Sequence, residues 1–208
     1  MIVDNGSFSW LDENIEKMFK KKLPDVGITN VLHNITMKFA PKTISVVIGK
    51  VGSGKSSLLF ALMNELKMYG GTVVKNGRIS FVPQEAWLLN TTLKENILFG
   101  MPYNEQKYEE ILTICELRSD LEMFPARDMT EIGERGINLS GGQKQRISLA
   151  RAVYSDRDIY LIDDALSALD AFVGKRIFEN VFQQKLKNKT IILVTHALQY
   201  LQYCNKVY

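Results

Sequence analysis

The sequence predicts an α/β domain with a mainly parallel sheet, and three observations lead to this prediction. Residues 44–48 form a short apolar run, Gly49–Ser56 match the spacing G-x-x-x-x-G-K-[ST], and a helical pattern follows directly. Phosphate-binding loops occur in this order of strand, glycine loop and helix. Further along, apolar runs at 159–162 and 190–194 alternate with helical patterns, as they do around parallel sheets.

The glycine loop predicts a phosphate site. Its glycines let the backbone bend so that several N–H groups converge on one point. Lys55 adds a cation there, and the hydroxyl of Ser56 can reach a metal ion. The helix that follows starts with partial positive charge, which favours anions. The residues expected to bind the ligand at this loop are Gly49, Lys50, Val51, Gly52, Ser53, Gly54, Lys55, Ser56 and Ser57.

Residues 1–45 are expected to form an antiparallel β subdomain. Residues 2–10 predict an edge strand that ends in aromatic side chains, and residues 31–39 predict a half-exposed antiparallel strand. Between them, residues 11–29 are polar and charged, which predicts a flexible loop insertion.

The region after the glycine loop is expected to contain one helix and a hairpin. The helix has an apolar face of leucine and methionine side chains and is predicted to end at Gly70-Gly71. Residues 72–74 and 78–82 flank Asn76-Gly77, a dipeptide typical of two-residue β-turns. We therefore expect these two strands to pair with each other.

The rest of the chain is expected to add helices to the same single domain. Residues 92–154 have a mostly helical pattern, in which Cys115 falls on an apolar face and is expected to fill the core. Another helix is predicted over 171–184, between the strands at 159–162 and 190–194. The predicted layout of residues 1–208 is the β subdomain at 1–45, an inserted helical subdomain at 91–155, and a core made of 46–90 and 156–208.

Composition narrows the classes of function. The chain has 26 basic and 23 acidic residues and a formal charge of +3, so no nucleic-acid partner is expected. Cys115 and Cys204 lack metal-site spacing, which predicts free thiols in a reducing compartment. No apolar run reaches the roughly 18 residues of a membrane span, so no transmembrane segment is expected. Both ends break off in strand-like patterns, which suggests a piece of a longer protein.

Two carboxylates follow the apolar run at 159–162. In an open α/β sheet, the carboxyl ends of the strands line the ligand crevice. Asp163 is therefore expected to hold Mg²⁺ through water, with Ser56 as a second ligand. The alternative is an aspartate that merely caps the next helix.

A second anion-binding helix start is predicted at Leu139-Ser140-Gly141-Gly142-Gln143, which we call the signature segment. One domain has no need of two such sites, so we expect this segment to cover a nucleotide held by the glycine loop of another domain. Alone it would also fit a capped turn, but the runs at 143–146 and 149–152 that follow make the motif specific.

With these motifs the sequence resembles the nucleotide-binding domain of ATP-binding-cassette (ABC) proteins over nearly its whole length. The resemblance implies a RecA-like P-loop NTPase core that binds ATP and Mg²⁺. It also implies that Gln84 touches the Mg²⁺ or the attacking water and that His196 contacts the γ-phosphate. Trp10 resembles the aromatic residue that stacks on adenine, although an edge-strand aromatic without a ligand is the alternative. Residues 167–170 resemble the D-loop.

Three further stretches, at 92–100, 132–136 and 170–175, resemble the first nucleotide-binding domain of multidrug-resistance-associated (subfamily C) transporters. Most ABC domains have Asp-Glu where this chain has Asp163-Asp164. The carboxylate of Asp164 is one methylene shorter and is expected to fall short of the attacking water. Because a misplacement of about 1 Å can cost about 10²-fold in rate, weak hydrolysis is predicted at this chain's own site.

The resemblance implies an ATP-binding and ATP-hydrolysing module of a membrane exporter, at the cytoplasmic face of a membrane. Its partners would be a second nucleotide-binding domain, joined head-to-tail through ATP, and transmembrane domains that face residues 85–96. One alternative is a regulatory nucleotide sensor of a channel-associated or receptor-type protein. A soluble repair or translation ATPase is disfavoured because residues 55–139 hold no long coiled coil, and the signature segment excludes a simple P-loop kinase.

Overall fold

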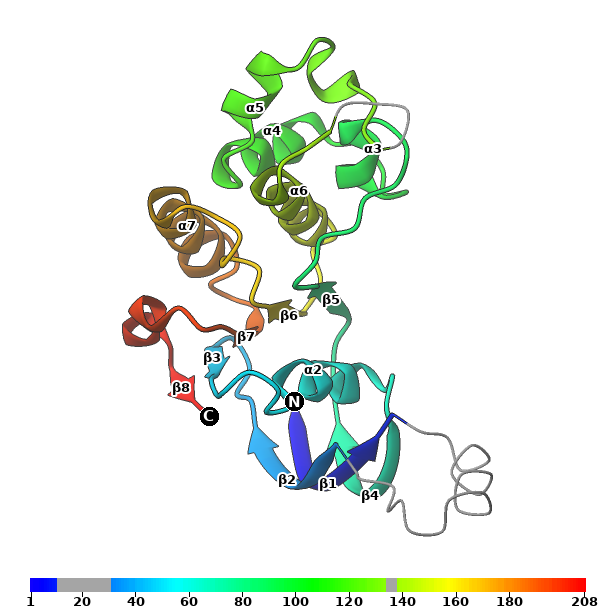
Figure 1. Ribbon diagram of the computed structural model, residues 1–208, viewed down its shortest axis with the longest axis vertical. Helices are drawn as coiled ribbons and strands as arrows, with labels where there is room; N and C mark the ends of the chain where they lie inside the picture. The colour runs from blue at the N-terminus through cyan, green and yellow to red at the C-terminus, as the bar shows by residue number, and fades with distance from the viewer. Residues whose placement is uncertain (11–30, 134–137) are drawn as a thin grey trace. The chain divides into compact units, whose positions relative to one another are not determined.

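The computed structural model describes residues 1–10, 31–133 and 138–208 (Figure 1). The chain divides into two compact units, which are described separately. The first unit holds residues 1–41 and 48–76, and the second holds residues 42–47 and 77–208. The predicted insertion at 11–29 and most of the predicted motif at 132–136 lie outside the described residues.

The first unit contains a three-stranded antiparallel sheet in the order β2-β1-β4 and the helix α2 (Figure 1). The helix buries one face through Leu58, Leu59 and Leu62, as its apolar periodicity predicts. The bounds are β1 (Ile2–Ser9), β2 (Leu32–Lys38), β4 (Lys67–Val74) and α2 (Lys55–Met63).

The prediction that residues 2–10 form an edge strand is wrong. β1 is the central strand, since β2 pairs with it on one side and β4 on the other. Its inward side chains Val3 and Phe8 are accordingly almost fully buried. A period-two pattern reports which face of a strand is buried but not how many neighbours the strand has.

The predicted end of the helix after the glycine loop is also wrong. α2 ends at Met63, where Asn64 adopts a left-handed conformation with φ of 67° and its N–H bonds back to the carbonyls of Phe60 and Ala61. Asparagine tolerates this conformation better than most residues, so it can end a helix as glycine does. Gly71 instead lies inside β4 with φ of 77°, where a Cβ atom would collide with the Asn5 carbonyl.

The predicted hairpin across Asn76-Gly77 does not form. β4 pairs with β1, whereas β5 (Ile79–Val82) pairs with β6 in the other unit's sheet. Gly77 has φ of 118°, and a Cβ atom there would lie 2.8 Å from the Cβ of Asp158. The carboxylate of Asp158 accepts the N–H of Arg78 at 2.8 Å. The dipeptide therefore serves a crossing from one sheet to another, in which glycine allows the close approach to Asp158.

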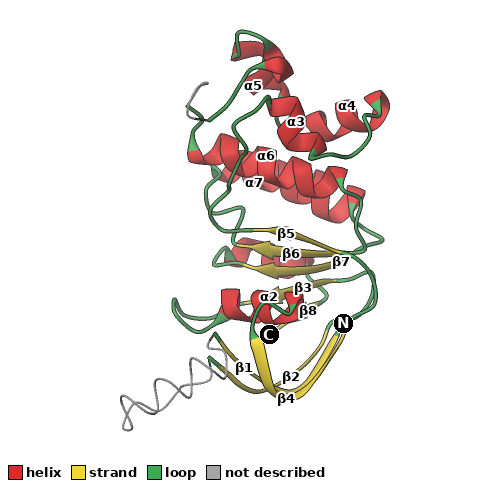
Figure 2. Cartoon of the chain, turned by 90° about the vertical axis from the view of Figure 1, so that its right-hand side faces the viewer, coloured by secondary structure: helices red, strands yellow, loops and turns green. Residues whose placement is uncertain are grey.

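The second unit is built on a five-stranded sheet in the order β5-β6-β7-β3-β8, and every neighbouring pair is parallel (Figure 2). β6 and β7 are fully buried along their length, as apolar runs in a parallel sheet predict. The fold class expected from the sequence is confirmed. The remaining bounds are β3 (Ile44–Val47), β6 (Ile159–Asp163), β7 (Thr190–Val194) and β8 (Lys206–Val207).

The long helix α6 packs against β5 on one side and against α3 and α4 on the other (Figure 2). Cys115 follows α4 and is fully buried as expected, and burial raises the pKa of its thiol. The helices of this unit are α3 (Leu93–Leu98), α4 (Glu105–Ile114), α5 (Arg118–Met123), α6 (Gly141–Tyr154) and α7 (Ala171–Ile177), with 3₁₀ or π segments η1 (Arg127–Met129), η2 (Phe178–Lys185) and η3 (Leu198–Tyr203).

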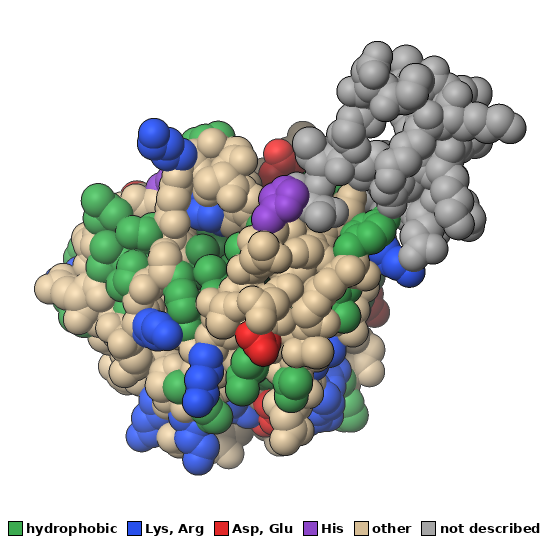
Figure 3. Space-filling model, turned by 90° about the horizontal axis from the view of Figure 1, so that it is seen from below, with side chains coloured by type: hydrophobic (Ala, Val, Ile, Leu, Met, Phe, Trp, Pro, Cys, Tyr) green, Lys and Arg blue, Asp and Glu red, His purple; other side chains and the backbone are tan. Residues whose placement is uncertain are grey.

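The surface is mixed in character. Figure 3 shows basic and hydrophobic side chains interspersed on one face of the molecule, with fewer acidic side chains among them. In the described parts of the chain, no helix combines the length and the hydropathy needed to cross a membrane.

Candidate functional site

The glycine loop, Gly49–Ser56, belongs to the first unit and leads into α2. Gly54 is the N-cap of this helix in a left-handed conformation with φ of 88°, and Gly52 has φ of 79°. A residue with a Cβ atom would be strained at either position. Among the described residues, no side chain caps this helix start, and its first turn holds no acidic residue. The N-terminal N–H groups of α2 are therefore suited to an anion.

The side chain of Lys55 folds back over the loop. Its Nζ donates to the carbonyls of Gly49 at 3.0 Å and Lys50 at 2.8 Å. The N–H of Ser53 donates to the Lys50 carbonyl at 3.2 Å and closes the turn. A Cβ atom on Gly49 would lie 2.8 Å from the Ser53 hydroxyl, which would have to move to make room for it. The ammonium group and the helix start therefore place positive charge at one place.

Trp10 lies beside the same helix. Its indole N–H donates to the hydroxyl of Ser57 at 3.3 Å, and its ring meets the ring of Phe60 edge-on with centroids 5.2 Å apart. The side chain is nevertheless 52% exposed. The structure thus brings together Trp10 and the first turns of α2, within the first unit, and leaves much of the indole accessible for stacking.

In the second unit, Asp163 and Asp164 lie at the carboxyl end of β6 and are 4% and 7% exposed. Asp164 has φ of 45°, and its N–H donates to the Val194 carbonyl at 2.8 Å. Its carboxylate accepts the Thr195 hydroxyl at 3.2 Å and the backbone N–H of His196 at 3.3 Å. The carboxylate of Asp164 is therefore tied to the end of β7, whereas the side chain of His196 is exposed.

The predicted D-loop, residues 167–170, lies directly before α7. The hydroxyl of Ser167 donates to the Asp164 carbonyl at 2.7 Å. Asp170 is the N-cap of α7 and accepts the N–H groups of Phe172 and Val173 at 3.1 and 3.0 Å. The helix-capping role that the sequence left open for the strand-end aspartates thus belongs to Asp170.

The signature segment forms the start of α6. The Ser140 hydroxyl accepts the N–H of Gln143 at 3.2 Å, and the side-chain carbonyl of Gln143 accepts the N–H of Ser140 at 2.9 Å. This reciprocal pair is a capping box. Gly141 is exposed, whereas a Cβ atom on Gly142 would lie 3.2 Å from the carbonyl of Ala168. The signature segment and the predicted D-loop are therefore neighbours in this unit.

Gln84 is exposed and is separated from the end of β5 by Pro83 alone. The residue before it is held in place, since the buried side chain of Gln145 on α6 donates to the Pro83 carbonyl at 2.9 Å. The position of the segment that starts at Gln84 is thus coupled to the helix of the signature segment.

Sequence reasoning missed a pair of polar residues that organises the chain after Gln84. Asn96 is fully buried and bonds through its amide to the backbone of Leu89 in both directions, at 2.8 and 3.0 Å. Arg151 donates to the backbone and side chain of Asn96 at 2.8 Å each, and its guanidinium stacks on Trp87. Burial lowers the pKa of Arg151 to about 10, which leaves it charged at neutral pH. A buried asparagine within the apolar pattern of 93–98 was the available signal.

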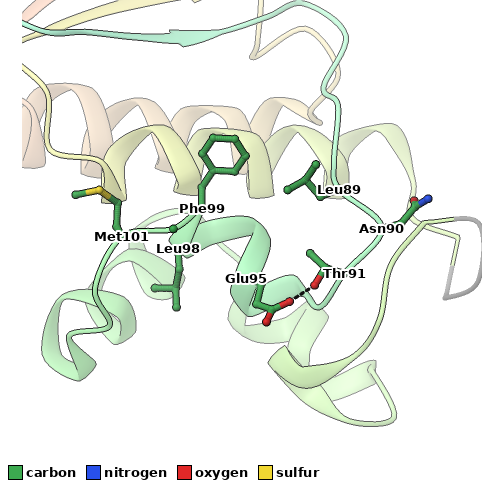
Figure 4. Close-up of a pocket in the computed structure, with 8 residues that line it drawn as sticks. Leu89, Asn90, Thr91, Glu95, Leu98, Phe99 and Met101 are labelled. Carbon is green, nitrogen blue, oxygen red and sulfur yellow. Dashed lines mark hydrogen bonds between the residues drawn. The ribbon is translucent and has the colours of Figure 1, made fainter.

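A cavity of about 710 Å³ lies beside this segment (Figure 4). Figure 4 shows Leu89 and Thr91 on the loop before α3, Glu95 and Leu98 on α3, and Phe99 and Met101 after it, with a hydrogen bond between Thr91 and Glu95. Trp87, Leu89 and Phe99 are each about half exposed, so apolar side chains face solvent here.

The residues expected at the site thus fall into two sets. The glycine loop and Trp10 lie in the first unit, and Gln84, the signature segment, Asp163, Asp164 and His196 lie in the second. Among the described residues, no group of three or more His, Cys, Asp or Glu side chains could hold a metal ion. Such a group is not required for Mg²⁺, which proteins often bind through one or two side chains together with phosphates and water.

Comparison with known proteins identifies the class. The sequence model of the family described as "ABC transporter" matches residues 32–167. The chain therefore belongs to the ABC transporter family, in agreement with its parallel sheet, its glycine loop and its signature segment.

The relatives narrow this to a subfamily. The chain is 47% identical over 98% of its length to ABC transporter C family member 3 of Dictyostelium discoideum. It is 48% identical over 99% of its length to Multidrug resistance protein mrp-7 of Caenorhabditis elegans, and 47% identical over 96% to ATP-binding cassette sub-family C member 3 of Rattus norvegicus. The resemblance to a subfamily C nucleotide-binding domain is confirmed. The chain spans 12% to 14% of the length of these relatives.

Proposed function

We propose that this chain is the ATP-binding and ATP-hydrolysing module of an ABC exporter of subfamily C. The observation that carries the proposal is the start of α2, where two left-handed glycines, an uncapped helix end and the ammonium of Lys55 form a cradle for phosphate. Within the described residues, no side chain caps this helix start. The family and the subfamily C relatives support the same activity.

ATP would be bound by residues 49–57, with the exposed indole of Trp10 stacked on adenine. Ser56, Gln84 and Asp163 would hold the Mg²⁺, which supplies charge neutralisation on the phosphates. The chain's own groups do the rest. Lys55 would move its donors from the loop carbonyls to the phosphates, and His196 has an exposed side chain that is suited to a contact with the γ-phosphate.

Hydrolysis at this chain's own site is proposed to be weak. Asp164 is shorter than glutamate, and its carboxylate already accepts bonds from Thr195 and His196. Both features keep it from activating water, because a general base must reach the proton that it removes. The same observation favours one second candidate, a regulatory nucleotide sensor that binds ATP and hydrolyses little.

The signature segment is proposed to act on a nucleotide held by a second nucleotide-binding domain in a head-to-tail dimer. Its two glycines and the Ser140 hydroxyl offer donors at a helix start. The transmembrane domains are the other proposed partners, on the cytoplasmic side of a membrane. They would contact residues 85–96, where Trp87 and Leu89 expose apolar surface and Leu89 also lines the cavity.

A paired experiment in the full-length transporter tests this function. Photolabelling with an azido-ATP reports nucleotide binding to this chain, and uptake into inside-out vesicles reports transport. An exporter module requires both binding and ATP-driven uptake. Labelling without ATP-driven transport would favour the sensor, and an absence of labelling would refute both.

A further inference from the structure

A buried carboxylate lies behind the signature segment. Asp120, on the short helix α5, is only 4% exposed. One of its oxygens accepts the side-chain amide of Gln143 at 3.0 Å, and the other accepts the guanidinium of Arg146 at 2.5 Å. Both donors come from the first two turns of α6, so a single side chain holds the start of that helix at two points.

The bond to Gln143 fixes which way its amide faces. Because the NH₂ group faces Asp120, the amide oxygen faces the backbone N–H of Ser140, which it accepts at 2.9 Å. An amide can present either end, and its neighbours decide which one. Asp120 therefore determines half of the capping box. With the N–H groups of Ser140 and Gln143 engaged, the signature segment presents the N–H groups of Gly141 and Gly142 and the Ser140 hydroxyl to an anion.

The bond to Arg146 controls the other side of the segment. The guanidinium of Arg146 is 3.7 Å from the position that a Cβ atom of Gly142 would occupy. Its side chain is 13% exposed and that of Asp120 is 5% exposed, so this ion pair is well shielded from water. Removing one partner from such a pair leaves an uncompensated charge, which moves toward water or a new partner. Without Asp120, the guanidinium, which lies close to Gly142, would lose the partner that holds it in place.

We propose that Asp120 is a positioning residue for the phosphate contact of the signature segment. This role of Asp120 rests on the proposed function, because it assumes that the signature segment acts on a nucleotide held by a second domain. Asp120 does not meet that nucleotide itself. It orients Gln143 and Arg146, and these orient the donors at the start of α6. It lies 23 residues from Gln143 along the chain and outside every motif recognised in the sequence.

The test is Asp120→Asn in the full-length transporter. Asparagine has one carbonyl oxygen and one NH₂ group, so it can accept a hydrogen bond from only one of the two donors. Its NH₂ group would face the other donor without bonding to it. Turnover of ATP is expected to fall roughly 10- to 100-fold, as for a misplacement of up to about 1 Å. Azido-ATP labelling of this chain's own glycine loop is expected to stay within about twofold of the wild type. Hydrogen exchange of the backbone amides at 139–143 is expected to speed up.

Two controls separate positioning from general loss of stability. Arg118 lies on α5, as Asp120 does, and forms an exposed ion pair with Glu109 on α4. Arg118→Gln breaks this pair and should leave turnover unchanged. Val181→Ala removes part of a fully buried side chain on η2 that takes no part in these bonds. It should lower the melting temperature at least as much as Asp120→Asn without the same loss of turnover.

The outcomes are distinguishable. The proposal is overturned if Asp120→Asn slows turnover no more than Val181→Ala does, or if exchange at 139–143 is unchanged. If Gly142→Val abolishes turnover while Asp120→Asn does not, the proposed role of the signature segment stands and only the role of Asp120 fails. If Gly142→Val is also silent, the proposed function of the segment fails and takes the role of Asp120 with it.

Discussion

Two helices of this chain begin at glycine-rich segments, and they begin in different ways. α2 starts at Gly54, and within the described residues no side chain caps it. α6 starts at Ser140 with a complete capping box, and Asp120 holds the glutamine of that box in place. The first helix start therefore leaves its N–H groups to water or a ligand, whereas the protein itself satisfies much of the second.

The difference fits two different tasks. A start without a side-chain cap, with a lysine folded over it, can enclose phosphate groups and exchange its internal bonds for bonds to them. A start that is already capped keeps its shape without a ligand and exposes only a few donors. Such a rigid surface suits a contact that is made when a second domain arrives, because little order has to be gained at that moment.

The largest effect is expected for a substitution that changes the start of α2 alone. Lys55→Ala should weaken ATP binding to this chain by about 10²-fold or more, because truncating a charged partner of the phosphates costs about 3 kcal/mol. Lys144→Ala, an exposed lysine in the first turns of α6, should leave this binding unchanged. Azido-ATP labelling of both variants measures the contrast. Equal losses would show that the two helix starts do not differ as argued.

The next largest effect is expected for a substitution at the start of α6. Gly142→Val places a side chain against the carbonyl of Ala168 and should lower ATP turnover of the assembled transporter by roughly tenfold or more. A Cβ atom on Gly141 would meet no other atom of the described residues, so a loss of turnover in Gly141→Val would report the proposed nucleotide contact alone. Both variants should still bind azido-ATP at their own glycine loop. A loss of labelling in Gly142→Val would mean that the two starts are not independent.

A smaller effect is expected for a substitution that tests whether this chain's own site binds ATP but hydrolyses it slowly. Asp164→Glu should raise turnover in the assembled transporter, but by no more than roughly tenfold. Full repair of a 1 Å misplacement could yield about 10²-fold, and Thr195 and His196 continue to hold the carboxylate. Adding Thr195→Val should raise turnover further. Unchanged turnover in both variants, with ATP labelling intact, would argue against a misplaced base.

The smallest effect concerns stability. Ser140→Ala removes the hydroxyl that accepts the N–H of Gln143 and should cost about 1 kcal/mol of unfolding free energy. Asn104→Ala removes the corresponding cap of α4, far along the chain from the signature segment, and should cost a similar amount. Denaturant titration measures both losses. Only Ser140→Ala should also slow ATP turnover. Equal losses of turnover in the two variants would show that the capping box contributes to stability alone.

Most of the candidate site was predictable because its signals are local. Glycines at 52 and 54 adopt the left-handed conformations that the loop requires, and the apolar runs at 159–162 and 190–194 are buried parallel strands. The serine and glutamine of the signature segment are three residues apart, which is the spacing of a capping box. In each case the residues that interact are neighbours along the chain, so their order alone carries the information.

The parts that failed or were missed depend on distant partners. The alternation in residues 2–10 indicated a strand, but only the return of the chain as β4 makes β1 central. Asn76-Gly77 indicated a turn, but β4 pairs with β1 and β5 pairs with β6, which lie in two separate sheets. Strand pairing depends on contacts across the fold, which a local pattern does not contain.

The family, the glycine loop and the helix start at the signature segment could thus be predicted from sequence, since each is encoded by residues within a few positions of one another. The tertiary structure alone decided which groups restrain the candidate chemistry. Asp164 meets Thr195 across 31 residues, and Asp120 meets Arg146 across 26. Such bonds form between polar side chains that folding buries together. Once buried, a polar group without a hydrogen-bond partner costs free energy, so these pairs are maintained.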